Sequence, residues 1–326
     1  MIRINDLLKH NFRIKNDKRL YCLIGQAQDG KVHFCNLANA PHILVGGCTD
    51  SGKSMLLHNM ILSLAKRYSP KEVGLVLLDP KETEFSVYHN LPHLLYKERT
   101  VQFCLNQLEE KLNEQKTTEQ KIVVVIDEYS ILADKEKQIV EKLVRLGHGV
   151  GIHVILATQR VANVSSVIKA CAQTVIACKV ADEIESLALL GETGAELLSE
   201  KGEILYRSQH QKNRRFTSGY ASKEDIKNIV EKVKMKCIEK GDLMDGTHIC
   251  PVCGKTVFSS QSSYEICSIC GWEDEGGCEE YPDEESGPNH CSLNEYRRRF
   301  FQRVQENPNY SWTKEMDEKW GRNRIN

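Results

Sequence analysis

Continuous apolar runs rich in valine, isoleucine and leucine alternate with segments of helical periodicity between residues 43 and 178. A strand buried on both faces of a parallel sheet has such a run, because neither of its faces meets water. Runs of this kind separated by helices are typical of α/β domains. The pattern predicts a mainly parallel sheet with strands at residues 43–45, 74–79, 121–127, 152–157 and 174–178, and helices at residues 54–67, 101–115 and 135–146.

Short alternating segments at residues 20–24 and 32–34 precede these runs. Asp29-Gly30 lies between them and is a strong signal for a tight hairpin turn. The sequence therefore predicts a short β-rich lead-in over residues 1–40.

A last amphipathic helix begins after Ser222, and Asp225 three residues later resembles the second half of a capping box. The polar, glycine-containing stretch 241–248 follows this helix and has the composition of a connector. We place the domain boundary there, with one domain over residues 41–240 and a smaller one over residues 248–326.

One loop of the first domain has the spacing G-x-x-x-x-G-K-S, which is typical of a phosphate-binding loop between a strand and a helix. Backbone N–H groups of such a loop and the helix N-terminus surround phosphate oxygens. Lys53 would reach the β- and γ-phosphates, and the Ser54 hydroxyl would bind Mg²⁺. The alternative is a glycine-rich turn without function. We therefore expect ATP and Mg²⁺ to bind at Gly47, Cys48, Thr49, Asp50, Ser51, Gly52, Lys53 and Ser54.

The strand at residues 121–127 ends in Asp127, which is followed by Glu128. Its carboxyl end would lie beside the phosphate loop, where Asp127 would hold Mg²⁺ through water. Glu128 would act as general base toward the water that attacks the γ-phosphate. Two solvated carboxylates without function are the alternative interpretation.

Gln159 ends the next strand at the same edge of the predicted sheet and is followed by Arg160. We expect Gln159 to contact the γ-phosphate or the attacking water, and Arg160 to contact a neighbouring molecule. A polar transition from strand to loop would give the same sequence without this role.

The composition is that of a globular protein, with 40% hydrophobic and 27% charged residues. Its net charge of −1 hides an asymmetry, because residues 241–326 carry 9 Lys/Arg and 16 Asp/Glu and the rest of the chain is basic. The split predicts two units with different partners. No apolar run is long enough to span a membrane and no signal pattern opens the chain, so we expect a cytoplasmic protein.

The 13 cysteines fall into two groups. The seven between residues 22 and 237 are scattered singly and are typical of small buried apolar residues. Two Cys-x-x-Cys motifs separated by 13 residues lie in the smaller domain, and two such motifs supply the four sulfurs of a structural zinc site. A redox role is the alternative. We expect Zn²⁺ to be bound by Cys250, Cys253, Cys267 and Cys270.

Several further strings of the first domain resemble the FtsK/SpoIIIE motor ATPases. They are PHILVGG at residues 41–47, LDPK at 78–81, EFSVY at 84–88, LPHLL at 91–95 and GVGIHVILATQR at 149–160. The resemblance implies a RecA-like P-loop ATPase that assembles as a hexameric ring and pumps double-stranded DNA through its channel. ATP would then lie between subunits, with an arginine supplied by the neighbouring subunit.

Two residues depart from the family pattern. Asp50 stands where the family usually has glycine, and His148 stands where it has the arginine before the Gly-Ile-His string. We also expect a motor core without the family's membrane anchor and DNA-reading winged helix. The remaining candidates for the arginine supplied to a neighbour are Arg145, Arg160, Arg207, Arg214 and Arg215.

The smaller domain resembles the cysteine-rich CPCC domain in the strings YEIC at 264–267, CGWED at 270–274 and SLNE at 292–295. That family begins with Cys-Pro-Cys-Cys, whereas this chain has Cys-Pro-Val-Cys at residues 250–253. The acidic stretch 273–285 would repel phosphates. We expect a zinc-stabilised module that binds a protein partner.

These features favour an ATP-driven motor that translocates double-stranded DNA as a ring. A coupling ATPase of conjugation or secretion that acts on protein is a second hypothesis. The third is a nucleotide-gated scaffold that hydrolyses little ATP, to which Asp50 and His148 point.

Overall fold

The structure is a computed structural model that describes residues 2–10, 19–97, 99–116, 119–199, 201–208, 212–244 and 246–321. The chain divides into two compact units, Met1–Val233 and Lys234–Asn326. The division falls within helix α7 (Lys223–Lys240). In the first turn of that helix, Ser222 and Asp225 exchange side-chain and backbone hydrogen bonds of 3.0 Å, which is the predicted capping box.

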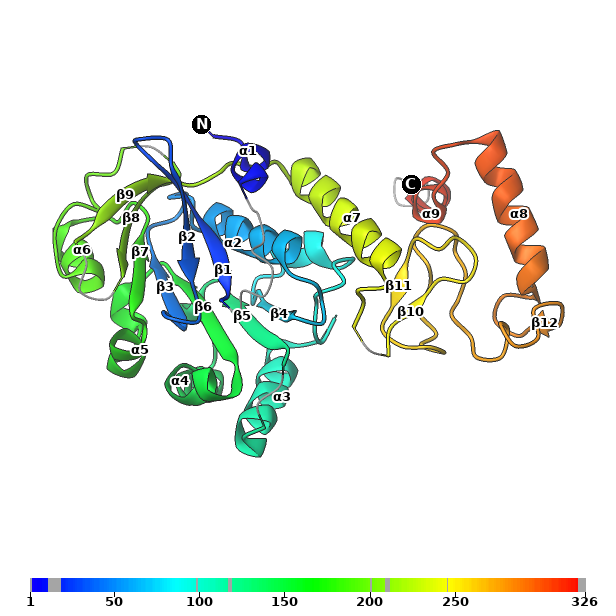
Figure 1. Cartoon of the computed structure of the whole chain (residues 1–326), viewed down its shortest axis with the longest axis horizontal. Helices are drawn as coiled ribbons and strands as arrows, with labels where there is room; N and C mark the ends of the chain where they lie inside the picture. Colours follow the sequence, from blue (N-terminus) through cyan, green and yellow to red (C-terminus); the bar gives the residue numbers. More distant parts are fainter. Residues whose placement is uncertain are drawn as a thin grey trace. The chain divides into compact units, whose positions relative to one another are not determined.

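The first unit is built on a nine-stranded sheet of order β2-β1-β9-β8-β7-β3-β6-β5-β4 (Figure 1). Five neighbouring strands pair in parallel, and the other four extend the sheet antiparallel beyond β7. The α/β fold with a parallel core is thereby confirmed. The parallel strands are β3 (His42–Gly46), β4 (Val73–Leu78), β5 (Lys121–Ile126), β6 (Ile152–Thr158) and β7 (Thr174–Ala177). The antiparallel strands are β1 (Tyr21–Ala27), β2 (Val32–Asn36), β8 (Glu203–Ser208) and β9 (Arg214–Thr217).

Helices cover both faces of this sheet. Alternate residues of the parallel strands face one large cluster of buried residues that includes four helices: α3 (Val101–Glu114), α4 (Asp134–Leu146), α5 (Ser166–Cys171) and α6 (Glu183–Leu190). Helix α2 (Lys53–Arg67) contacts β1 and β4 and lies outside that cluster. Shorter helical segments are α1 (Ile4–Lys9), η1 (Phe85–Tyr88), η2 (Tyr129–Ile131), η3 (Gly147–Val150) and η4 (Val161–Asn163).

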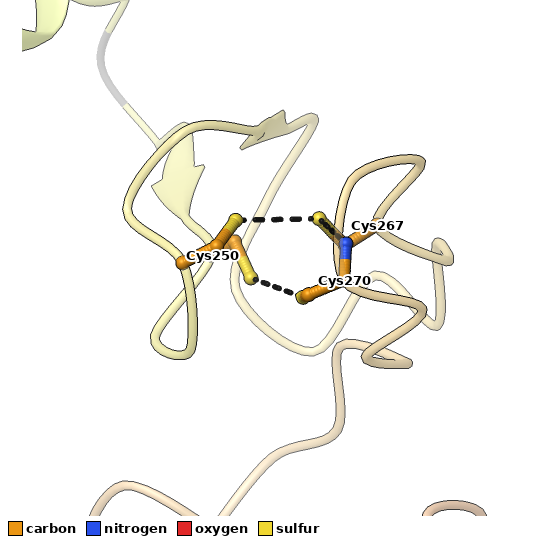
Figure 2. Close-up of side chains that lie close together, drawn as sticks. Cys250, Cys267 and Cys270 are labelled. Carbon is orange, nitrogen blue, oxygen red and sulfur yellow. Dashed lines mark hydrogen bonds between the residues drawn. The ribbon is translucent and has the colours of Figure 1, made fainter. Parts of the chain in front are cut away.

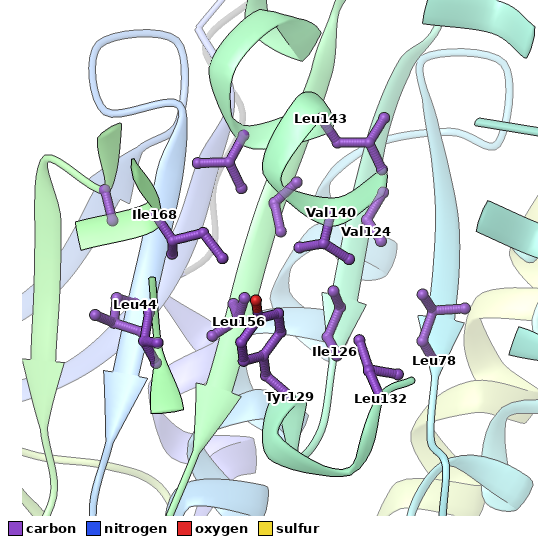
Figure 3. Packing of buried hydrophobic residues seen from close by; sticks show 14 of the residues in the cluster. Leu44, Leu78, Val124, Ile126, Tyr129, Leu132, Val140, Leu143, Leu156 and Ile168 are labelled. Carbon is purple, nitrogen blue, oxygen red and sulfur yellow. The ribbon is translucent and has the colours of Figure 1, made fainter. Parts of the chain in front are cut away.

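The cluster shows why the strands read as continuous apolar runs. Figure 3 shows Leu44, Ile126 and Leu156 of three strands packed beneath Val140 and Leu143 of α4. These five side chains are almost completely buried. Their strand neighbours face the opposite side of the sheet, because side chains alternate along a strand. Both faces are therefore apolar, and only the ends of the strands are free to carry polar chemistry.

The second unit is small and has little regular structure. Two short hairpins, β10 (His248–Ile249) with β11 (Val257–Phe258) and β12 (Glu285–Ser286) with β13 (Cys291–Ser292), are followed by α8 (Leu293–Glu306) and α9 (Trp312–Gly321). Its buried residues include the completely buried Trp272 and three of the four cysteines of the two motifs. The fourth, Cys253, is half-buried and packs against them. Among the described residues of both units, no helix is long and apolar enough to cross a membrane.

Candidate functional site

Parallel pairing brings the predicted nucleotide residues to one edge of the sheet. Gly46 at the end of β3 is in register with Thr158 at the end of β6, and Ile126 of β5 is paired with Leu156 of β6. The segments that follow these residues are the phosphate loop, Gln159 and the Asp127-Glu128 pair. The carboxyl edge of an open α/β sheet is where ligands bind in such folds.

The phosphate loop has a backbone that few residues adopt. Gly52 has φ of 98°, and Asp50 has φ of 61°. Only glycine, asparagine and aspartate visit this left-handed region readily. The loop ends at Gly52, and α2 starts at Lys53, so the N-terminal N–H groups of the helix face the same space as the loop.

The Lys53 ammonium is held inside this loop. It donates hydrogen bonds to the carbonyl oxygens of Gly47 at 2.7 Å and Cys48 at 2.8 Å. Burial lowers the pKa of Lys53, although Cys178, Glu128 and Asp127 act in the opposite direction. An ammonium has three N–H donors, so these two bonds orient the side chain and leave a donor for an anion.

Asp127 and Glu128 occupy different environments. Burial, followed by the charges of Asp79 and Glu84, raises the pKa of Asp127 to about 6. Glu128 is only 4% exposed and accepts hydrogen bonds from Ser130 Oγ and, at 3.2 Å, from the backbone N–H of Gln159. The carboxylates around Asp127 repel one another, and this repulsion favours the binding of a divalent cation that prefers oxygen ligands. The donor set therefore fits Mg²⁺.

Gln159 joins the loop to the carboxylates. Its side-chain oxygen accepts a hydrogen bond of 3.2 Å from Thr49 Oγ1, while its backbone N–H binds Glu128. The predicted sensor residue thus contacts both halves of the site.

These residues line one cavity of about 350 Å³. It is bordered by Thr49, Asp50, Gly52, Lys53, Ser54, Asp127, Glu128 and Gln159, which the sequence predicted, and by Met55, Lys81, Thr83, Glu84 and Lys201, to which it assigned no role. A volume of this order is typical of small-ligand sites.

Two of the unassigned residues have defined partners. The Glu84 carboxylate lies 3.6 Å from His58 Nε2, whose other ring nitrogen contacts Tyr88 Oη at 2.8 Å. Lys201 Nζ lies 3.1 Å from Asp50 Oδ1. Glu84 lies within a string that carries the resemblance, which was the available signal for it, whereas nothing in the sequence brings Lys201 to the loop.

The candidate arginines are dispersed. Within the described residues, none of the five lines this cavity. Arg207 donates to the Leu190 carbonyl, and Arg215 pairs with Glu203 at 3.7 Å. Arg214 lies over the ring of Phe216, whereas Arg145 and Arg160 are exposed. His148 is exposed as well.

The four cysteines of the second unit converge on one point. Their sulfurs lie within 4.8 Å of one another, with Cys250 3.6 Å from Cys270 and Cys253 3.5 Å from Cys267 (Figure 2). Sulfurs at about 2.3 Å from a tetrahedral metal are separated by roughly 3.8 Å. The cluster is therefore a candidate metal site with four sulfur ligands.

The two motifs have the same backbone design. Gly254 N–H binds the Cys250 carbonyl at 3.0 Å, and Gly271 N–H binds the Cys267 carbonyl at 2.7 Å. Both glycines have positive φ, 65° and 82°. Backbone N–H groups also point at sulfur, from Lys255 to Cys253 and from Cys270 to Cys267, each at 3.4 Å. Donors of this kind stabilise thiolates and support the cluster as a metal site.

Comparison with known families matches both parts of the chain. Residues 3–103 match the FtsK/SpoIIIE family, and residues 248–306 match the cysteine-rich CPCC family. The DNA translocase FtsK of Leptospira interrogans serovar copenhageni is 32% identical over 269 residues, which covers 71% of this chain and 28% of that protein. DNA translocase FtsK of Haemophilus influenzae is 30% identical over 303 residues, with coverage of 76% and 57%. The chain thus spans from about a quarter to somewhat over half of these relatives' lengths.

Solved structures share the fold of the first unit. The cytoplasmic domain of the Thermomonospora curvata type VII secretion ATPase EccC superposes with a TM-score of 0.60 at 20% identity, covering 71% of this chain and 34% of that one. The pCW3 conjugation coupling protein TcpA with ATPγS gives 0.56 at 23% identity, with coverage of 68% and 71%. The resemblance read from the sequence is therefore confirmed. In its first unit the chain is thus similar to FtsK/SpoIIIE-family ATPases, and in its second unit to the cysteine-rich CPCC family.

Proposed function

We propose that the first unit hydrolyses ATP and uses the energy to move double-stranded DNA. The observation that carries this proposal is the meeting of the phosphate loop, Asp127, Glu128 and Gln159 at a single cavity. Relatives that are 30–32% identical and named DNA translocase support the choice of DNA.

Each residue of the cavity has a role in this proposal. Loop N–H groups and the Lys53 ammonium bind the phosphates, and Ser54 and Asp127 hold Mg²⁺, which neutralises phosphate charge. Glu128 accepts the proton of the attacking water. Gln159 positions that water, since its backbone already binds Glu128 and its side chain binds the loop.

We further propose that subunits assemble as a hexameric ring in the cytoplasm and that an arginine from a neighbour completes each site. Arg160 is the preferred candidate because it follows Gln159 directly and is exposed. Arg207 is less suitable, since its guanidinium already binds the carbonyls of Leu189 and Leu190.

For the second unit we propose a structural zinc ion at the four cysteines. Four sulfur ligands close the coordination shell and leave no position for catalysis. The acidic charge of this unit favours a protein partner over nucleic acid. Mass-spectrometric metal analysis of the purified chain tests this assignment, and the expected result is about one zinc ion per chain.

The rate of ATP hydrolysis with and without long double-stranded DNA tests the motor proposal. Strong stimulation by DNA is expected. Hydrolysis that is indifferent to DNA would favour a coupling ATPase acting on protein, and a chain that binds ATP without hydrolysing it would favour the nucleotide-gated scaffold.

A further inference from the structure

Asp50 places a negative charge inside the phosphate loop. Its side chain is 87% exposed, and its backbone has φ of 61°. It borders the same cavity as Lys53 and Ser54. A carboxylate at this place repels phosphates unless another group neutralises it.

Lys201 is the group that meets this carboxylate. Its ammonium lies 3.1 Å from Asp50 Oδ1 and borders the nucleotide cavity. Lys201 lies in the segment before β8 and is 151 positions away from Asp50 in the chain. Exposed ion pairs add little to folding stability, so the pair is better understood through what binds beside it.

The backbone next to Lys201 is packed against the loop. Gly202 N–H donates to the Ser51 carbonyl at 3.4 Å, and the Gly202 carbonyl accepts a bond of 2.8 Å from Ser218 N–H. A Cβ on Gly52 would lie 3.0 Å from Gly202 N. The start of the Lys201 side chain is therefore fixed relative to the phosphate loop that carries Asp50.

The charge balance of the cavity shows why this lysine matters. Three lysines border it, Lys53, Lys81 and Lys201, together with four carboxylates, those of Asp50, Glu84, Asp127 and Glu128. Without Lys201, the cavity would have two lysines and four carboxylates, and this excess of negative charge would disfavour a polyphosphate.

We infer that Lys201 is a positioning residue of the nucleotide site, which neutralises Asp50 so that the loop of this chain accepts phosphates. The inference rests on the proposed nucleotide binding. Lys201 acts through Asp50, and this distinguishes it from Lys53, which contacts the phosphates themselves.

The test measures binding of a fluorescent ADP analogue with Mg²⁺ to the full chain. Lys201→Met is expected to raise the dissociation constant at least about fivefold at low ionic strength, and less at high salt, where charges are screened. Asp50→Asn removes the repelling charge and keeps a residue that tolerates positive φ. The double variant Asp50→Asn/Lys201→Met should therefore bind within about twofold of Asp50→Asn.

Two controls accompany these variants. Lys201→Arg keeps the charge and should bind like the parent chain. Lys31→Met removes another exposed lysine that pairs with an aspartate, Asp29 at 2.9 Å, and should leave binding unchanged.

Three outcomes would overturn the inference. Unchanged affinity in Lys201→Met would show that the pair has no role in binding. A double variant as weak as Lys201→Met would mean that Lys201 contacts phosphate directly. A chain that binds no nucleotide would refute both the proposed function and the inference, whereas binding that requires Lys53 but not Lys201 would refute only the inference.

Discussion

At the scale of single residues, the phosphate loop depends on backbone conformations that most side chains avoid. Gly52 combines φ of 98° with a close approach to Gly202. The motif spacing in the sequence predicts this glycine, and the structure supplies the reason for it: a Cβ here would be strained and would press on the segment that carries Lys201.

Gly52→Ala should therefore weaken nucleotide binding by tenfold or more, because the strain of roughly 1–3 kcal/mol would be relieved by displacing the loop. Titration with a fluorescent ADP analogue measures the effect. Gly149→Ala is the matched control, since a Cβ at Gly149 meets no described atom within 4 Å. Equal affinities for the two variants would contradict this explanation of the loop.

At the scale of elements, a buried hydrogen bond links two parallel strands at the sheet edge opposite the proposed nucleotide site. The Val154 N–H donates to Nδ1 of the buried His42 at 3.1 Å, which joins β6 to β3. A ring nitrogen can accept only when it carries no proton. Burial, together with the nearby His148, lowers the pKa of His42 to about 4.

This bond predicts a pH dependence of stability. Between pH of about 6.5 and about 4 the unfolded chain binds a proton at His42 that the folded chain does not, so the free energy of unfolding falls as the pH decreases. From pH 7 to 5.5 the loss due to this residue is about 1 kcal/mol. His42→Asn keeps an acceptor and does not titrate, so urea unfolding at the two pH values should show a correspondingly smaller loss. An equal loss in both proteins would refute the assignment.

The two cysteine motifs belong to the buried core of the second unit. Cys270→Ser should abolish stoichiometric metal binding and unfold this unit, because its core is small and the ligands belong to it. Metal analysis and the near-ultraviolet circular dichroism of the tryptophans, all three of which lie in the second unit, report the change. Cys278→Ser replaces a buried cysteine outside the cluster and should retain the metal. Loss of metal in both variants would contradict the assignment of the four ligands.

At the scale of the whole molecule, the sequence predicts those elements that have a recognisable pattern within a short stretch of the chain. Each parallel strand is a continuous apolar run, and the phosphate loop and the cysteine motifs have fixed spacings. The antiparallel strands β8 and β9 give weaker signals: only three consecutive residues of β8 are buried, and β9 has four residues and begins with two exposed arginines.

The unassigned residues of the cavity have the same explanation. Lys201 reaches Asp50 only because β8 pairs with β7 and β9 and thereby brings the preceding segment to the loop. Glu84 depends on the turn after β4, where the Asp79 carboxylate accepts bonds from the backbone N–H groups of Glu84 and Phe85. The long-range pairing that places Lys201 leaves no trace in spacing or periodicity, whereas the local turn that places Glu84 lies within a string that carries the family resemblance.

The central claim is that Glu128 is the general base for hydrolysis of an ATP molecule held by the phosphate loop. The most direct measurement compares Glu128→Gln with the parent chain, both for hydrolysis and for binding of a fluorescent ADP analogue. Loss of a general base predicts hydrolysis reduced by about 10²-fold or more, with nucleotide affinity within about twofold. Hydrolysis that survives in Glu128→Gln, or affinity that falls along with the rate, would contradict the account.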